Sequence, residues 1–151
     1  MDKEKFQKYL KERYYDQIKW YDIKSSKCQK WYEIFQWALI IFSAMTPALI
    51  AIEWKLSLFS TLKWLPIITS IFVAILTSAL KTFKLQENWI SYRTTCETLK
   101  KEIHFYEANV DEYTDIKDKE ALFVKRVENL ISRENTLWIS VQKEEIKKRN
   151  S

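Results

Sequence analysis

The side chains of this chain whose types and spacing suggest chemistry are neutral hydroxyl and amide groups inside two apolar segments. Six of them form two groups, which are Gln36, Ser43 and Thr46 in the first segment and Thr69, Ser70 and Thr77 in the second. With about 100° of rotation per helical residue, Gln36, Ser43 and Pro47 fall on one face and form a polar line. Such lines face a water-filled lumen or hydrogen-bond a neighbouring helix.

Catalytic and metal-binding residues are sparse. The single His104 and the two distant cysteines, Cys28 and Cys96, do not have the spacing of metal ligands. Glycine is absent, which excludes Gly-rich phosphate loops, and the lack of Asn-Gly turns argues against an all-β fold. We therefore expect no enzyme, no cofactor and no metal site.

The acidic residues are dispersed and lie near Lys or Arg, as solvated pairs on helix faces do. Two examples are Glu97 with Lys100 or Lys101, and Glu128 with Lys125. Because acids interleave with the basic residues, the net charge of +5 does not indicate nucleic-acid binding. The membrane surface explains the basic residues better.

The two apolar segments, residues 34–52 and 64–80, contain no charged residue. As helices they would be about 28 and 25 Å long, and the hydrocarbon core of a bilayer is about 30 Å thick. The alternative is a pair of buried core helices in a soluble bundle, but such helices usually carry charge on one face. The segments therefore predict an all-α membrane protein built on a transmembrane helical hairpin, with the lipid bilayer as its partner.

Charge and aromatic residues predict the orientation of this hairpin. Residues 1–33 hold nine Lys or Arg and residues 81–151 hold fourteen, whereas residues 53–63 between the spans hold two. The positive-inside rule then places both termini in the cytoplasm, where the cysteines stay reduced. No cleavable signal is evident before the first span. Aromatic residues near the span edges form a belt: Trp31, Tyr32, Trp37, Trp54, Trp64, Trp89 and Tyr92.

Small residues and prolines suggest how the two spans pack. Ser70, Ala74 and Ser78 recur at every fourth position and form a seam that lets helix backbones approach closely in lipid. This seam predicts a helix contact, either within one chain or between chains. Pro47 predicts a kink because it removes the hydrogen bond to the Ser43 carbonyl. Residues 53–63 are apolar for a loop and either lie among the headgroups or form a plain connector.

The polar arms outside the spans carry apolar residues at three- and four-residue spacing, which is typical of helices. One helix is expected from Lys3 into the first span, and the second span is expected to continue as one helix to near Val110. A polar turn over 111–118 precedes a last helix over 119–147. The three long helices then form an antiparallel cytoplasmic bundle that is continuous with the hairpin. The predicted parts are a cytoplasmic N-terminal helix at 1–33, the hairpin at 34–80 and a cytoplasmic helical hairpin at 81–151.

A dense motif follows the second span. It contains Gln86, Glu87, Trp89, Ile90, Tyr92 and Arg93, and it continues through Glu97 to Leu99, Lys100 and Glu102. Further motif residues are Gln17, Trp20 and Tyr21 before the spans, and Phe123, Arg126, Val127, Glu128, Glu134 and Trp138 near the end. In these residues the chain resembles the SLATT proteins, small two-span membrane proteins of bacteria, in the branch described as a domain of unknown function. Members often have Ala or Gly near the first cytoplasmic turn, where this chain has Ser25 and Ser26.

The resemblance implies a place in the bacterial inner membrane and a role as a pore-forming effector, in some members coupled to nucleotide-sensing immunity modules. Two spans cannot enclose a lumen, so several copies would have to assemble. The first hypothesis is therefore a homo-oligomeric membrane pore or ion channel. The alternative is a membrane-anchored interaction or scaffold protein whose bundle binds a partner through Trp89, Tyr92 and Trp138, although these rings also suit a bundle core.

Arg93 leaves two interpretations open. With Glu97 or Glu128 it forms either a buried pair that fixes the register of the bundle helices or an ordinary surface pair. In the buried case, Arg93→Ala lowers the thermal stability or the recovery of the oligomer in detergent.

Overall fold

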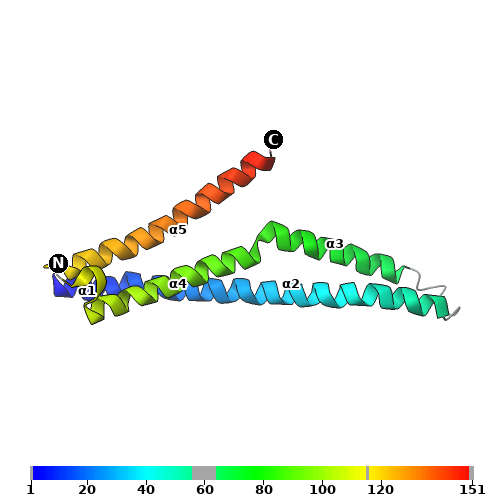
Figure 1. Cartoon of the computed structure of the whole chain (residues 1–151), viewed down its shortest axis with the longest axis horizontal. Helices are drawn as coiled ribbons and strands as arrows, with labels where there is room; N and C mark the ends of the chain where they lie inside the picture. The colour runs from blue at the N-terminus through cyan, green and yellow to red at the C-terminus, as the bar shows by residue number, and fades with distance from the viewer. Residues whose placement is uncertain (1, 56–63, 115, 150–151) are drawn as a thin grey trace. The chain divides into compact units, whose positions relative to one another are not determined.

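The computed structural model describes residues 2–55, 64–114 and 116–149, without the side chains of 52–55, 134–135 and 137–149. Every regular element in the described residues is helical, which confirms the predicted all-helical fold (Figure 1). In chain order the elements are the α-helix α1 (Lys3–Tyr9), the π-helix η1 (Leu10–Tyr14), the α-helices α2 (Tyr15–Lys55), α3 (Leu65–Phe83) and α4 (Leu85–Ala108), the 3₁₀ turn η3 (Asp111–Tyr113) and the α-helix α5 (Lys119–Arg149).

The N-terminal arm is helical from Lys3 onward, as its apolar spacing predicts. The Asp2 carboxylate caps α1 by accepting the backbone N–H of Glu4 at 3.4 Å. The π-helix η1 was not predicted. Phe6, Leu10 and Tyr14 are spaced by four residues and are all buried. A spacing of four residues is longer than the 3.6-residue turn of an α-helix, so side chains at this spacing drift around the helix. The π-helix has more residues per turn, which reduces this drift and keeps the three side chains on the face toward the core.

The expected unbroken helix from the second apolar segment to near Val110 is wrong. α3 ends at Phe83, Lys84 takes a left-handed conformation with φ 45° and ψ 40°, and α4 begins at the next residue. A left-handed residue other than glycine costs energy because its Cβ crowds the backbone carbonyl. Asn88 offsets this cost, since its side-chain amide donates to the Phe83 carbonyl at 3.2 Å and its backbone N–H donates to the Lys84 carbonyl at 3.0 Å.

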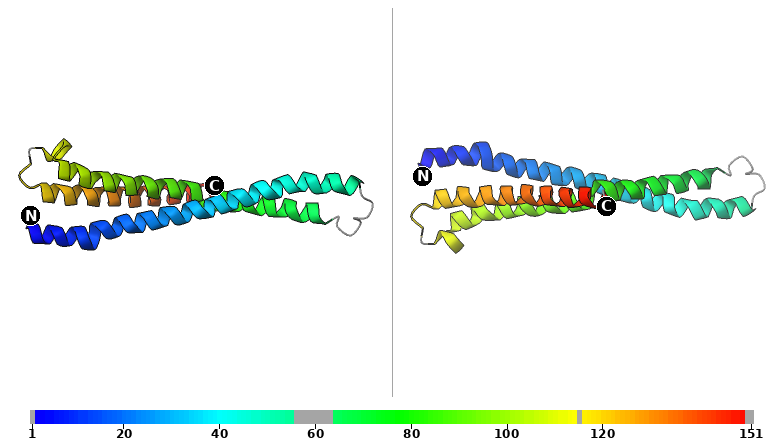
Figure 2. Two further views of the ribbon diagram at one scale, coloured as in Figure 1. Left: turned by 90° about the horizontal axis from the view of Figure 1, so that it is seen from below. Right: turned by 90° about the horizontal axis from the view of Figure 1, so that it is seen from above.

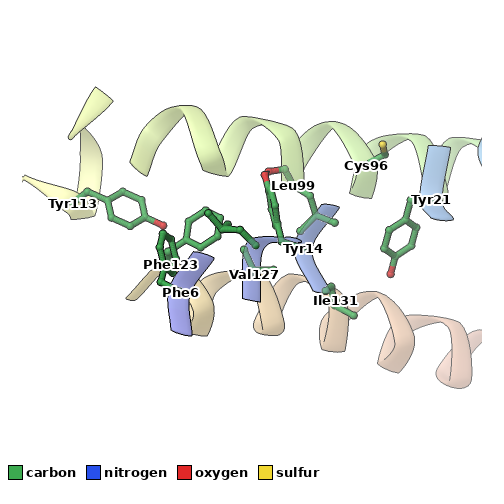
Figure 3. Close-up of a cluster of buried hydrophobic side chains, with 10 residues drawn as sticks. Phe6, Tyr14, Tyr21, Cys96, Leu99, Tyr113, Phe123, Val127 and Ile131 are labelled. Carbon is green, nitrogen blue, oxygen red and sulfur yellow. The ribbon is translucent and has the colours of Figure 1, made fainter. Parts of the chain in front are cut away.

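Packing divides the chain into two compact units. The bundle unit comprises Met1–Ser25 and Ile90–Ser151, and the hairpin unit comprises Ser26–Trp89. In the bundle unit, the N-terminal helices, α4 and the first half of α5 pack around an aromatic core (Figures 2 and 3). The Phe6 ring lies 5.2 Å from the Tyr106 ring and 5.6 Å from the Phe123 ring, so one side chain contacts two other helices. The buried apolar core is Phe6, Leu10, Tyr14, Tyr21, Cys96, Leu99, Tyr113, Phe123, Val127 and Ile131.

The predicted turn between α4 and α5 begins where expected, but it also supplies a core residue. Asn109 and Asp111 have positive φ angles of 55° and 60°, and the short helix η3 follows. Tyr113, in this otherwise polar stretch, is fully buried (Figure 3). The last helix begins at Lys119, as its apolar spacing predicts.

In the hairpin unit, the second half of α2 and α3 run antiparallel, side by side (Figure 2). In the described part of the chain, two helices are long and apolar enough to cross a membrane. In their most apolar stretches, none of the residues of the first and 6% of those of the second are buried. α2 continues through Pro47 without interruption. The two interpretations of the connection at 53–63 fall largely on residues 56–63, which lie outside the described residues.

Candidate functional site

Thr46 and Thr69 form the polar contact between the two apolar helices of the hairpin unit. Their hydroxyl oxygens are 3.0 Å apart, and Thr69 is only 5% exposed. The rings of Phe42 and Phe72 stack beside them, with centroids 5.6 Å apart and planes inclined by 15°. The structure therefore brings together one predicted polar residue from each segment, and these two contacts define which helix faces meet.

The hydrogen bonds of this pair are satisfied within the hairpin. The Thr46 hydroxyl lies 2.9 Å from the Phe42 carbonyl, and the Thr69 hydroxyl lies 2.9 Å from the Pro66 carbonyl. Two hydroxyl protons thus serve three contacts, so one hydroxyl donates to the other while the second donates to its own backbone. Thr46 and Thr69 therefore belong to the intrachain helix contact and are not available to line a passage.

Four other predicted residues lie on one side of the hairpin unit. At about 100° per residue, Gln36 and Ser43 lie about 60–80° around α2 from Thr46. Ser70 and Thr77 lie about 80–100° around α3 from Thr69, in the same rotational sense. Because the helices are antiparallel, equal rotation from a shared contact brings both pairs to the same side. We call Gln36, Ser43, Ser70 and Thr77 the polar side.

The opposite side of the hairpin unit is apolar. The residues rotated the other way from the helix contact are Ala38, Met45, Ile68, Phe72 and Ile75. Met45, Ile68 and Ile75 are 43%, 46% and 58% exposed, respectively. The hairpin unit therefore has one polar side and one apolar side, although each of its helices has a predominantly apolar sequence.

The small-residue seam shares Ser70 with the polar side and takes no part in the intrachain contact. Ser70, Ala74 and Ser78 are all exposed, whereas the contact face of α3 centres on the buried Thr69. The hydroxyls of Ser70, Thr77 and Ser78 donate to carbonyls one turn back at 2.7–2.8 Å, so their oxygen lone pairs face outward. The seam is thus an open surface of the hairpin unit.

A groove of about 330 Å³ continues the polar side at one end of the hairpin unit. Gln36 belongs to both the polar side and this groove. The Lys84 ammonium lies 3.6 Å from a Glu87 carboxylate oxygen, and the exposed Lys81 brings a second positive charge. The lining residues are Tyr32, Gln36, Leu80, Lys81, Lys84, Gln86 and Glu87, which we call the basic groove.

In the bundle unit, Glu102 is the one buried acid among the described residues. It is 4% exposed, and it accepts hydrogen bonds from the Tyr113 hydroxyl and from the Arg126 guanidinium, whose Nε lies 2.5 Å away. Arg126 also contacts Glu112 at 2.7 Å. Burial, followed by the hydrogen bond to Glu102, raises the pKa of Tyr113. The hydrogen bonds to Glu102 and Glu112 raise the pKa of Arg126, so both partners hold fixed protonation states.

This network gives two motif residues, Glu102 and Arg126, a structural role that sequence reasoning did not find. A groove of about 330 Å³ runs beside it, between α4 and α5, and Phe105 and Leu130 supply its apolar lining. The Arg126 guanidinium at its edge is already bonded to Glu102 and Glu112, so its charge is neutralised inside the protein. The sequence signal that could have revealed the pair is the position of Glu102 and Arg126, each of which lies on a helix face that is otherwise apolar.

Glu128 joins α5 to the N-terminal helices. It accepts the Tyr9 hydroxyl at 2.9 Å, and both of its oxygens bond the Arg13 guanidinium at 3.2 Å. The expected pairing of Glu128 with Lys125 is therefore wrong, because a bidentate partner from another helix offers better geometry. The hydrogen bond from Arg13 lowers the pKa of the Glu128 carboxyl.

Arg93 forms surface pairs. Its guanidinium lies 3.0 Å from Glu97 and 3.4 Å from Asp22, and its side chain is 52% exposed. Glu97 also contacts Lys100 at 3.4 Å. Of the two interpretations of Arg93, the structure matches surface pairing with Glu97, and Glu128 is not its partner.

The remaining motif residues occupy different places. Tyr92 packs against the rings of Trp20 and Tyr21, at 5.8 and 6.2 Å, so it contributes to the bundle packing. Trp89 is half-buried, and Gln86 lines the basic groove. Trp138 lies in α5, but its side chain falls outside the described part of the chain.

Metal-binding and thiol chemistry have little support in the residues that the structure describes. No group of three or more His, Cys, Asp or Glu side chains there could hold a metal ion. Cys96 is fully buried, and burial raises the pKa of its thiol, which therefore stays protonated at neutral pH.

Comparison with known proteins connects the chain to one family. No curated protein and no solved structure has significant similarity to it. The profile of the family described as "protein of unknown function (DUF4231)" matches residues 16–121, which include the whole hairpin unit, all of α4 and the start of α5. Since the match covers more than half of the chain, this protein belongs to the DUF4231 family.

Proposed function

We propose that the chain is a two-span membrane protein, several copies of which assemble into a pore for ions. The observation that carries the proposal is the polar side of the hairpin unit, formed by Gln36, Ser43, Ser70 and Thr77. Amide and hydroxyl groups that face hydrocarbon lose their hydrogen bonds to water. Their free energy is therefore lower when they face water or another copy of the chain than when they face lipid. Pro47 adds the Ser43 carbonyl, which lacks its helical partner, to the same side.

Exposed aliphatic side chains support a place in lipid. Ile41, Ile71 and Ile75 are each more than half exposed. Exposing apolar surface to water costs about 25 cal/mol per Å², and contiguous patches promote aggregation. A hydrocarbon solvent removes this cost without any change in the hairpin.

Assembly from several copies follows from the size of the hairpin. Two helices cannot enclose a passage, but the polar sides of several hairpins arranged around an axis can. The seam of Ser70, Ala74 and Ser78 shares Ser70 with the polar side and is exposed. Small residues let a neighbouring helix approach closely at the edge of such a lumen.

The resemblance to the SLATT proteins adds support, since the role inferred for them is pore formation. Under this proposal the chain lies in the bacterial inner membrane, and the basic flanks support a topology with both termini in the cytoplasm. The chain itself has no catalytic role, and its activity is the passage of ions through a homo-oligomer.

The proposal is tested by ion flux from liposomes that contain the purified full-length chain, together with the copy number of the detergent-solubilised complex. We expect an ion leak and a complex of several copies. Replacing Ser70 and Thr77 by Leu should abolish the leak because it removes the polar lining from α3. Replacing Ile68 and Ile75 by Leu, on the opposite side of the same helix, is the matched control and should preserve it.

A monomer or simple dimer with no leak would contradict the pore. That result would favour the alternative, a membrane-anchored interaction protein whose bundle unit binds a partner.

A further inference from the structure

The basic groove carries one uncompensated positive charge per chain. The exposed Lys81 makes no ion pair with any described residue, whereas Lys84 lies 3.6 Å from Glu87. The charges of Lys84 and Glu87 therefore offset each other at the groove. The net charge that remains there belongs to Lys81.

Lys81 extends the polar side. It follows Thr77 by four residues, which places it about 120° around α3 from Thr69, in the same sense as Ser70 and Thr77. The nearest acid on α2, Glu33, does not line the groove, and its carboxylate accepts a hydrogen bond from the Gln29 amide at 2.9 Å. A passage along the polar side therefore meets the unpaired Lys81 at this end, while the one acid that lines the groove, Glu87, is offset by Lys84.

We infer that the proposed pore conducts anions in preference to cations, and that Lys81 determines this preference. The inference depends on the proposed function, because an assembly with the polar sides inward places one Lys81 from each copy around the passage. A ring of ammonium groups between low-dielectric walls concentrates anions and repels cations. In the described residues, the rest of the polar side carries no charge.

One feature of the lining opposes this preference. The Ser70 and Thr77 hydroxyls donate to their own backbone, so they present oxygen lone pairs that suit cations. These groups are neutral and can rotate to donate instead, whereas the charge of Lys81 is fixed in sign. The full charges of the lysine ring therefore outweigh the dipoles of the hydroxyls.

The test is the reversal potential of currents through planar bilayers that contain the full-length chain, under a potassium chloride gradient. We expect the reversal potential of the unmodified chain to be shifted from zero toward the equilibrium potential of chloride. Lys81→Gln should lower the chloride-to-potassium permeability ratio by about tenfold, and Lys81→Glu should reverse the preference. Lys81→Arg should keep it, which separates charge from any effect on folding.

Two control variants leave the groove intact. Lys27→Glu makes the same charge change as Lys81→Glu at another exposed position of the hairpin unit, and Glu33→Gln removes an acid of α2 that lies outside the groove. Neither should change the sign of the reversal potential. Cation-selective currents through the unmodified chain, or a Lys81→Glu variant that still prefers chloride, would overturn the inference. Either result would still support the formation of a pore. The absence of any current would overturn the proposed function itself.

Discussion

The bundle unit and the hairpin unit bury opposite kinds of surface. In the bundle, the aromatic rings of Phe6, Tyr14 and Phe123 lie inside, and the one buried carboxylate, that of Glu102, has two hydrogen-bond partners. In the hairpin, the isoleucines lie outside, and the most buried side chain of α3 is the polar Thr69. Each unit is consistent with a different solvent, since water favours the first arrangement and hydrocarbon favours the second.

The comparison also separates two uses of polar groups. Ionic groups in the bundle join a turn and three helices through Arg126, which pairs with the buried Glu102, and through Arg13, which pairs with the partly exposed Glu128. The apolar stretches of the hairpin unit, 34–51 and 64–80, contain only neutral polar groups, and the hydroxyls of Thr46 and Thr77 bond carbonyls one turn back. A charged group has no such local partner, so its cost in hydrocarbon is much larger.

The largest effect should come from placing a charge on the outer surface of each unit. Ile71 in the hairpin and Ile23 in the bundle are 53% and 57% exposed, so they form a matched pair. Ile71→Lys should prevent stable membrane insertion, because a lysine near the centre of a span costs about 2.5–3.5 kcal/mol. Ile23→Lys should have no effect on insertion, because Ile23 belongs to the bundle unit and lies outside the proposed spans.

The measurement is the fraction of each variant that stays in the membrane after alkaline extraction. Equal retention of Ile71→Lys and the unmodified chain would mean that the outer face of α3 is not in lipid. Loss of Ile23→Lys from the membrane would mean that the two units do not differ in solvent.

The next largest effect concerns the buried ion pair. Arg126→Met leaves the Glu102 carboxylate buried without its cation, and breaking such a pair costs about 3–5 kcal/mol of folding free energy. Arg93→Met removes an exposed guanidinium that pairs with Glu97 and Asp22, and the expected cost is below about 1 kcal/mol. Denaturant unfolding followed by circular dichroism measures both. Similar losses for the two variants would contradict the assignment of Arg126 as the structural pair and Arg93 as a surface pair.

Hydrophobic spacing was sufficient to predict most helices and much of the core. Phe6, Leu10, Tyr14 and Tyr21 recur at helical intervals and are all buried, because periodic apolar residues have to share one face. Phe123, Val127 and Ile131 follow the same spacing in the last helix and are also buried. Hydrophobic spacing did not find the break at Lys84, since that break depends on one amide of Asn88 bonding the Phe83 carbonyl, and no periodicity records such a contact.

The partners of charged residues were the part that sequence could not supply. Glu128 lies 115 residues from Arg13 along the chain, and only the packing of α5 on the N-terminal helices brings them together. Tyr113 was hidden because its neighbours are acidic, although it fills the core and bonds Glu102. In the hairpin, the polar residues were found individually, but their division into a contact pair and a polar side required the Thr46–Thr69 distance.

A smaller effect is expected at the hydroxyl pair of the hairpin. Thr46→Val and Thr69→Val each remove one side of the interhelical hydrogen bond while keeping the branched shape. Double-mutant cycles on such bonds in membrane proteins average about 0.6 kcal/mol, so the coupling between the two substitutions should be of that size. Unfolding of the four forms in detergent measures it. A coupling energy near zero would show that the stacking of Phe42 on Phe72 alone aligns the helices.

The smallest effect is a pH dependence at Glu128. The Arg13 hydrogen bond lowers the pKa of this carboxyl below its ordinary 4.5, so the folded state favours the ionised form more than the unfolded state does. The resulting stability is present above about pH 4.5 and is lost as the pH falls through the folded-state pKa. Because the pair is partly exposed, its contribution should be about 0.2–1 kcal/mol. Denaturant unfolding of the unmodified chain and of Glu128→Gln should differ by this amount at pH 7 and converge near pH 3, while a difference independent of pH would assign the effect to packing instead of charge.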